Sequence, residues 1–281
     1  MKLPAFIKPR QYEKFILLLV CILGTLALRG ARLPSRVKIP IFAYHNICGA
    51  SGQNTSLTIT SLKFMEDMMA IKKAGYTTIF FRDLIGFCCG QTELPAKPAL
   101  VTLDDGYESS YIYAYPILKQ LGLKATVFII GASVGRQTDA ISGQAIIPHF
   151  SFAQAREMVD AGVMDIQLHT YALHTPQDNM LSIRSRFASS REYEDFLIQD
   201  CLKLRREIQT QTGLSASTLA YPFGFYNQAA ERAMRQAGVL CTVSSRSGIN
   251  FLRRDPESLF GLKRIFPGSV PLAKILRRVS A

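Results

Sequence analysis

Short apolar segments alternate with longer amphipathic segments along most of this 281-residue chain. Apolar runs that are rich in β-branched and aromatic residues predict buried strands, whereas apolar residues that recur every three or four positions predict helices. The expected strands cover residues 37–44, 77–81, 99–103, 125–130, 163–168 and 218–221. The expected helices cover residues 61–74, 111–120, 152–161 and 191–212, with a short helix near Leu84. Because strands alternate with helices, the predicted fold class is α/β with a parallel sheet.

Turn-forming residues support these boundaries. Gly75 and Gly122 follow two of the expected helices, and Ser151 is a suitable N-cap for the helix that runs through Ala161. Residues 134–148 contain two glycines and are expected to form a loop. The methionine-rich face of the first helix is expected to be core rather than a cofactor site; it comprises Phe64, Met65, Met68, Met69 and Ile71.

The strand that ends at Leu103 is followed by two adjacent carboxylates and a glycine, Asp104-Asp105-Gly106. A short apolar run that Gly closes is typical of a buried strand that delivers its last residues to an edge of the sheet. Two neighbouring carboxylates repel each other unless a cation or a shared proton compensates, so the pair predicts a metal ligand beside an acid or base. A solvated turn explains the same residues equally well, since Asp and Gly are common in turns.

Two of the four histidines of the chain, His169 and His174, follow the strand expected at 163–168. On a helix, positions five apart diverge by roughly 140°, so a loop has to bring the two side chains together, and Pro176 favours a loop. Imidazoles and one carboxylate make the three-ligand site that is typical of catalytic zinc, with water in the remaining position. Asp105, His169 and His174 match this ligand set.

Three motifs and their order carry a resemblance to a known family. The first is Leu103-Asp104-Asp105-Gly106, the second is the loop that begins at His169-Thr170, and the third is Ala-Tyr-Pro-Phe-Gly at 220–224. In these motifs the chain resembles the polysaccharide deacetylases, carbohydrate esterase family 4, from about residue 37 to residue 265. The spacing of its histidines and the upstream Tyr44-His45 are most similar to the branch that removes N-acetyl groups from poly-β-1,6-N-acetylglucosamine in biofilm matrix. The fold of that family, a distorted (β/α) barrel, agrees with the alternation of strands and helices.

The resemblance implies metal-assisted hydrolysis of an N-acetyl group, with Asp104 as the base that removes the proton of the attacking water. Pro222 fixes φ and lacks a donor, whereas the Phe223 amide is free to stabilise an oxyanion, and the resemblance assigns that role to Phe223. Tyr221 is expected by resemblance to line the substrate cleft. A Pro-Gly turn after the strand accounts for the same local geometry and does not exclude these roles.

The general acid departs from the pattern of the family. Many members carry a histidine near the C-terminus in this role, but this chain has no histidine after His174. In the biofilm-polymer branch an early Tyr-His motif takes the role, so the resemblance assigns it to His45, whose unperturbed pKa of about 6.5 suits proton donation near neutral pH. A capping or packing histidine at a strand end is the alternative. His149 matches no catalytic motif and is expected to be a loop residue.

The N-terminus carries four basic residues before a nearly unbroken apolar run at 15–28, which predicts an export signal. The run is shorter than the roughly 20 residues of a bilayer span, and basic residues flank it on both sides, so a cleaved signal and a retained membrane anchor both stay open. A buried core helix is a third reading. The expected organisation is a basic leader at 1–14, the signal core or anchor at 15–28, a linker at 29–36 and a polysaccharide deacetylase domain at 37–281. This organisation places the domain outside the cytoplasm, at the outer face of the cytoplasmic membrane or the cell surface.

The composition indicates which binding partners are expected and which are not. The formal net charge of +12 indicates attraction to anionic surfaces, so a membrane or an anionic cell-envelope surface is an expected partner. The basic residues are scattered and no nucleic-acid-binding motif is present, so nucleic acid is not expected. Five of the six cysteines follow the apolar run; their spacing matches no zinc finger, and the adjacent Cys88-Cys89 pair favours a packed face over a disulfide. At least one thiol is therefore expected to be free unless it pairs between chains.

The expected substrate is an acetylated amino-sugar polymer, and the expected cofactor is one divalent metal ion, zinc by default, with cobalt, nickel or iron as alternatives. The motifs do not identify the linkage, so peptidoglycan, chitin oligomers and O-acetyl esters stay open as substrates. Outside enzymes, a surface carbohydrate-binding protein with a decayed site is the alternative. The intact acidic and histidine residues argue against decay.

Overall fold

The computed structural model describes residues 36–138 and 143–280. The basic leader, the predicted signal or anchor at 15–28 and all of the linker except Arg36 therefore lie outside the described residues. Within the described residues, no helix has the length and apolar character that a membrane span requires.

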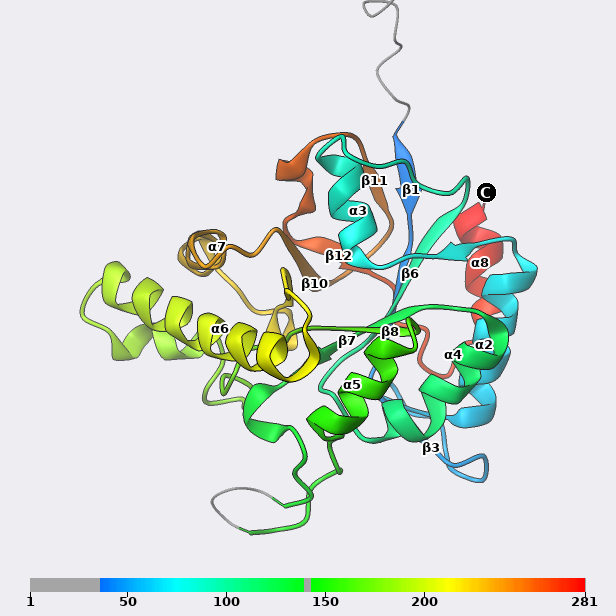
Figure 1. The fold of residues 1–281 in the computed structure, drawn as a ribbon, viewed down its shortest axis with the longest axis horizontal. Coiled ribbons are helices and arrows are strands. Elements are labelled where there is room, and N and C mark those ends of the chain that lie inside the picture. Colours follow the sequence, from blue (N-terminus) through cyan, green and yellow to red (C-terminus); the bar gives the residue numbers. More distant parts are fainter. Residues whose placement is uncertain (1–35, 139–142, 281) are drawn as a thin grey trace, which may run out of the picture. The chain divides into compact units, whose positions relative to one another are not determined.

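A parallel sheet forms the centre of the fold (Figure 1). The first and the last strand of the sheet are joined by hydrogen bonds to Ile265, the residue that follows the last strand. The Ala43 N–H donates to the Ile265 carbonyl at 2.8 Å, and the Ile265 N–H donates to the Ile41 carbonyl at 2.7 Å. The sheet is thus nearly closed into a (β/α) barrel, as the sequence predicts. In spatial order its strands are β12 (Leu262–Arg264), β10 (Cys241–Ser247), β9 (Thr218–Ala220), β8 (Met164–Leu168), β7 (Ala125–Ile129), β6 (Pro98–Leu103) and β2 (Ile41–Tyr44), and β5 (Thr77–Thr78) also pairs with β6.

Both faces of these strands are buried. On β6, Val101 and Leu103 belong to the core that packs under the outer helices, whereas Leu100 belongs to a second core that α3 covers. This two-sided burial explains why the strands are continuous apolar runs rather than alternating ones. The helices are α2 (Ser61–Lys73), α3 (Phe81–Cys88), α4 (Tyr115–Leu121), α5 (Phe152–Asp160), α6 (Ser190–Thr212), α7 (Gln228–Gln236) and α8 (Leu272–Ser280).

The predicted helices are confirmed, and local capping sets their ends. The Ser151 hydroxyl accepts a hydrogen bond from the Gln154 N–H at the start of α5. Gly122 and Gly213 follow α4 and α6 with left-handed φ angles of 67° and 77°, a conformation that glycine adopts without a steric penalty. The helix predicted at 111–120 consists of a π-helical segment, Ser110–Ala114, that continues into α4.

Several local predictions are wrong. The strand predicted at 37–44 is broken at Pro40, which has no N–H to donate, so β1 (Val37–Ile39) pairs antiparallel with β11 (Asn250–Leu252) instead of joining the barrel. The strand predicted at 77–81 ends at Thr78, because the Asp83 carboxylate accepts from the Phe80 N–H at 2.9 Å and starts α3. A further parallel pair, β3 (Asn46–Cys48) with β4 (Thr58–Thr60), was not predicted.

Two predictions about packing hold only in part. In the methionine-rich face of α2, Phe64, Met68 and Ile71 are buried, but Met69 is 54% exposed. All five described cysteines are free, as the absence of a disulfide framework predicts. Of the adjacent pair, Cys88 is buried and Cys89 is exposed, so only one of the two belongs to the packed face.

Candidate active site

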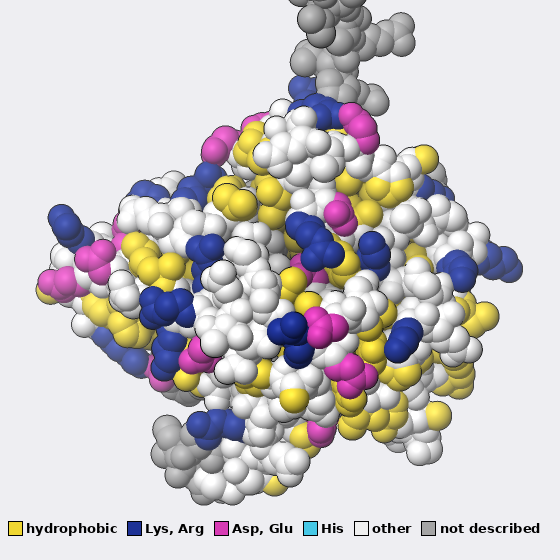
Figure 2. Space-filling model, in the orientation of Figure 1, with side chains coloured by type: hydrophobic (Ala, Val, Ile, Leu, Met, Phe, Trp, Pro, Cys, Tyr) yellow, Lys and Arg dark blue, Asp and Glu magenta, His cyan; other side chains and the backbone are white. Residues whose placement is uncertain are grey.

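The carboxyl ends of four barrel strands bring the predicted site residues together. His45 follows β2, the two aspartates follow β6, His169 follows β8 and Phe223 lies just after β9. Figure 2 shows no histidine on the face of the molecule that it draws. These residues line one cavity of about 340 Å³, whose walls are His45, Leu57, Asp104, Asp105, Tyr107, His169, His174, Tyr221, Phe223, Gly224, Ser245, Arg264 and Phe266.

Three of these side chains converge closely. Asp105 Oδ1 lies 3.4 Å from His169 Nε2 and 3.2 Å from His174 Nε2, and the two Nε2 atoms are 3.1 Å apart. One ligand atom from each residue therefore lies within 4.8 Å of the others. The loop after β8 thus brings His174 back to His169, as the sequence reasoning required. Their role as ligands stays a prediction.

The donor set fits a divalent cation. His169 Nδ1 lies 2.7 Å from the Ala220 carbonyl oxygen, to which it donates, so the lone pair of Nε2 faces Asp105. Asp105 Oδ1 is buried and accepts no hydrogen bond in the described part of the chain. Burial alone raises the pKa of Asp105, but the neighbouring His169 and His174 hold it well below its usual value. A buried carboxylate beside two imidazoles requires positive charge, which a divalent ion such as zinc supplies.

The backbone around the site is strained. Among the described residues, only three that are not glycine have a left-handed φ, and all three are here: Asp105 at 72°, Thr170 at 67° and Phe223 at 57°. Such conformations cost on the order of 1–3 kcal/mol each and persist where the surroundings enforce them. Gly224 continues the third turn with a φ of 75°, and a Cβ there would lie only 1.8 Å from Ser245 Oγ. The strain is therefore concentrated where the predicted ligands and oxyanion donor are positioned.

Helix α6 and the turn after β7 hold the histidine loop from two sides. The Asp200 carboxylate of α6 accepts from the N–H groups of Tyr171 and Ala172, at 2.7 and 3.1 Å. The Gly131 N–H donates to the Thr170 carbonyl at 3.1 Å. Asp200 thus positions the loop without entering the cavity, and no motif in the sequence distinguishes it from the other acidic residues of α6.

His149, which the sequence suggested was only a loop residue, supports the strained Asp105. It is buried, and its Nδ1 lies 3.0 Å from the Asp105 carbonyl oxygen, to which it donates. Its ring packs against Tyr107 with a centroid distance of 5.0 Å. His149 does lie in a loop, as the sequence predicts, but this loop returns to the end of β6, where the Phe150 N–H donates to the Gly106 carbonyl.

Asp104, the predicted base, forms a buried ion pair with Arg264. Arg264 Nη1 lies 2.7 Å from Asp104 Oδ1, and both side chains are at most 3% exposed. Burial raises the pKa of Asp104, but Arg264, His45 and His169 together outweigh the effect of burial and hold the pKa below its usual value. Asp104 is therefore ionised at neutral pH and oriented by its partner.

Arg264 was missed by the sequence analysis. It lies in β12, a strand of three residues that the hydrophobic pattern did not predict, and it is one of 33 Lys and Arg residues. Its Nε also donates to the Ser244 carbonyl at 3.0 Å. Burial, not a motif, distinguishes Arg264 and Lys63 from the other described basic residues, and only Arg264 lines the cavity.

The remaining predicted residues occupy different depths. His45 Nε2 lies 3.7 Å from Asp104 Oδ2. The Phe223 ring is 41% exposed and stacks on His174 at 4.8 Å, and the Phe223 N–H has no acceptor among the described residues. The Tyr221 ring is only 1% exposed and stacks on Tyr226 at 4.1 Å, so it forms a deeply buried part of the cavity wall. Contact between Tyr221 and a substrate stays a prediction.

Comparisons with known proteins agree with this picture. Residues 91–241 match the family model described as polysaccharide deacetylase. The Bacillus subtilis protein "Putative polysaccharide deacetylase YxkH" is 28% identical over 233 residues, which are 81% of this chain and 71% of that protein. The poly-beta-1,6-N-acetyl-D-glucosamine N-deacetylase of Escherichia coli K12 is 20% identical over 226 residues; the match covers 74% of this chain but only 34% of that enzyme.

A solved structure shows the same fold. The structure of IcaB from Ammonifex degensii superimposes with a TM-score of 0.71 at 22% identity, covering 87% of this chain and 97% of that one. The barrel predicted from the sequence is thus confirmed. Because the family model also covers more than half of the chain, the chain belongs to the polysaccharide deacetylase family.

Proposed function

We propose that the chain is a metal-dependent hydrolase that removes N-acetyl groups from an extracellular N-acetylglucosamine polymer, with poly-β-1,6-N-acetylglucosamine as the first candidate. Membership of the polysaccharide deacetylase family supports the reaction class. The observation that carries metal dependence is the convergence of Asp105 Oδ1 with the Nε2 atoms of His169 and His174 around a buried carboxylate oxygen without a donor.

The residues around these ligands supply the rest of the chemistry. Asp105, His169 and His174 would hold a divalent ion, which would supply Lewis-acid polarisation of the amide carbonyl and activation of the attacking water. Asp104, ionised and oriented by Arg264, accepts the proton of the attacking water. The unpaired Phe223 N–H is available to the oxyanion, and His45, which lines the same cavity, protonates the departing amine. The products are acetate and a polymer with free amines.

The relatives support the substrate. The E. coli relative is named for poly-β-1,6-N-acetylglucosamine, although this chain spans about a third of it. The Tyr44-His45 motif and the absence of a histidine after His174 agree with that branch. Peptidoglycan, chitin oligomers and O-acetyl esters are the alternative substrates. The apolar run at 15–28 supports placement of the enzyme at the outer face of the cytoplasmic membrane or the cell surface.

The test is acetate release from a panel of acetylated glycans, measured with the purified full chain, with a chelator, and after zinc is restored. We expect release from poly-β-1,6-N-acetylglucosamine to exceed release from peptidoglycan and chitin oligomers, to stop with chelator and to return with zinc. The Asp104→Asn variant is the matched inactive control. Binding of the polymer without acetate release under any metal would show a carbohydrate-binding protein, and release that is insensitive to chelator would overturn the metal centre.

A further inference from the structure

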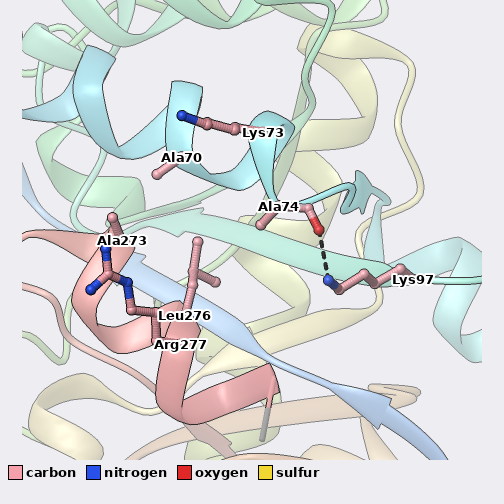
Figure 3. A pocket seen from close by; sticks show the side chains of 7 residues that line it. All are labelled: Ala70, Lys73, Ala74, Lys97, Ala273, Leu276 and Arg277. Atoms are coloured by element: carbon pink, nitrogen blue, oxygen red, sulfur yellow. Dashed lines mark hydrogen bonds between the residues drawn. The ribbon is translucent and has the colours of Figure 1, made fainter.

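A basic cleft lies between α2 and α8 (Figure 3). We call it the α2–α8 cleft. Its volume is about 390 Å³. Its apolar part is formed by Ala70, Ala74, Ala273 and Leu276, and its cations are Lys73, Lys97 and Arg277.

The cations of the α2–α8 cleft are not neutralised by neighbouring acids. Lys97 Nζ donates to the Ala74 carbonyl at 2.6 Å, whereas Lys73 and Arg277 form no hydrogen bond or ion pair within residues 36–138 and 143–280. Helix α8 contains basic residues and no acidic ones, and the last turn of α2 contains Lys72 and Lys73. Figure 2 agrees, because its right-hand edge, where Figure 1 places α2 and α8, displays Lys and Arg side chains without visible acidic ones.

The cleft lies at the opposite end of the barrel strands from the active site. Lys97 directly precedes β6 and Asp104 directly follows it, so the strand separates them by roughly 20 Å. The chain also enters the barrel at the end where Lys97 lies, because β2, its first barrel strand, runs parallel to β6. The residues before β1 include the apolar run at 15–28 that predicts a membrane signal or anchor.

We infer that the α2–α8 cleft binds the headgroup phosphates of anionic phospholipids, so that the barrel rests on the membrane with its strand-end site facing outward. Lys and Arg attract phosphates of an anionic leaflet, and the alanines at the cleft surface, Ala70, Ala74 and Ala273, contact the apolar glycerol and upper acyl region. An anionic polymer would be attracted by the same charges, but it would make no apolar contact with the alanines of the cleft. The inference concerns orientation and is independent of the chemistry at the active site.

The test uses a fluorescent reporter, which the chain allows because it contains no tryptophan. Met69 is exposed and lies one helical turn before Lys73, so Met69→Trp places a single indole beside the cleft. The full chain is reconstituted into vesicles of phosphatidylcholine, with or without phosphatidylglycerol, that carry a spin label on a small share of headgroups. We expect the label to quench the indole in the phosphatidylglycerol vesicles only, and the quenching to fall at high salt.

The variant Lys73→Gln/Arg277→Gln, made in the Met69→Trp background, is expected to weaken this contact roughly 30-fold, since each basic side chain near an anionic leaflet contributes about fivefold. The control Arg191→Gln/Arg206→Gln removes the same charge from exposed positions of α6 and is expected to leave the quenching unchanged. Equal quenching in both lipid mixtures, or equal loss in the control, would overturn the site. A response of the indole to soluble polyphosphate, with none to phosphatidylglycerol vesicles, would assign the cleft to an anionic polymer instead.

Discussion

Asp104 and Arg264 form an ion pair at the strand-end site in which both side chains are at most 3% exposed, whereas Lys73 and Arg277 at the opposite end of the barrel are exposed and unpaired in the described part of the chain. A buried charge has to be matched by a partner in fixed geometry, so it positions reacting groups, and the loss of one partner is costly. Exposed charges contribute little to stability but attract an anionic surface from a distance and are screened by salt. Substitutions at the two ends of the barrel should therefore have separable effects.

The largest expected effect is at the ligands. His169→Ala removes one of three converging donors and is expected to eliminate the bound ion and acetate release, while the fold survives because the barrel core does not depend on the ion. Metal content by mass spectrometry and far-ultraviolet circular dichroism measure the two outcomes. His45→Ala, which removes a histidine from the same cavity but no predicted ligand, is the control. Full metal occupancy in both His169→Ala and His174→Ala would contradict the ligand assignment.

The adjacent aspartates should separate binding from turnover. Asp105→Asn is expected to weaken metal binding, because Oδ1 of Asp105 faces both imidazoles. Asp104→Asn is expected to keep the metal and lower turnover by on the order of 10²–10⁴-fold, because Asp104 is paired with Arg264 and is the proposed base. Metal titration and acetate release on the same samples distinguish them. Equal metal loss in the two variants would show that the aspartates act as one ligand unit.

His45 should matter only where the leaving group needs a proton. His45→Ala is expected to keep the metal and reduce amide hydrolysis by on the order of 10²–10⁴-fold, because the amine has to be protonated to leave. An activated aryl acetate has a better leaving group and should be affected much less. The amide pH profile should also lose its alkaline limb. Comparable losses on both substrates would show that His45 maintains the structure of the site instead.

The free energy of unfolding of an Arg264 variant measures how much the buried ion pair with Asp104 contributes to stability. In the metal-free protein, Arg264→Gln is expected to lower the free energy of unfolding by about 3–5 kcal/mol at neutral pH, because it leaves the Asp104 charge buried and unpaired. The pKa of Asp104 is depressed in the folded wild type, so its contribution is present above the unfolded pKa of about 3.9 and is lost as pH falls through the lower folded pKa.

In Arg264→Gln, the stability deficit should shrink as pH falls, since protonation of Asp104 removes the unpaired charge. Denaturant unfolding at several pH values measures both effects. Arg156→Gln is the control, because it breaks an exposed pair with Asp160 and is expected to change stability by only about 0–1 kcal/mol. A deficit that does not depend on pH would mean that Arg264 acts through packing rather than through its charge.

The smallest effect is expected at the other end of the barrel. Lys73→Gln/Arg277→Gln should change the free energy of unfolding by no more than about 0.5 kcal/mol and leave metal content and acetate release from a soluble substrate unchanged. Only the lipid contact should be lost. A loss of metal in this variant would show that the two ends of the barrel are coupled.

The site was predictable where its residues follow predicted strands. Asp104, Asp105 and His169 come directly after apolar runs, and the carboxyl ends of parallel strands meet at one edge, so their convergence follows from the hydrophobic pattern. Arg264, His149 and Asp200 were not predictable in this way. They come from a three-residue strand, a connecting loop and a solvent-facing helix, and they reach the site only through contacts with residues at least 28 positions away in the sequence.

The sequence by itself determined the fold class, the family and the strand ends at which the chemistry lies, because periodicity and short motifs are local and survive without knowledge of packing. The tertiary structure alone decided which charges are buried. It paired Arg264 with Asp104, left the carboxylate oxygen of Asp105 without a donor, and left Lys73 and Arg277 exposed at the opposite end of the barrel. Burial depends on which distant segments pack together, so arginine is a buried residue of the candidate active site at one end of the barrel and an exposed surface residue at the other.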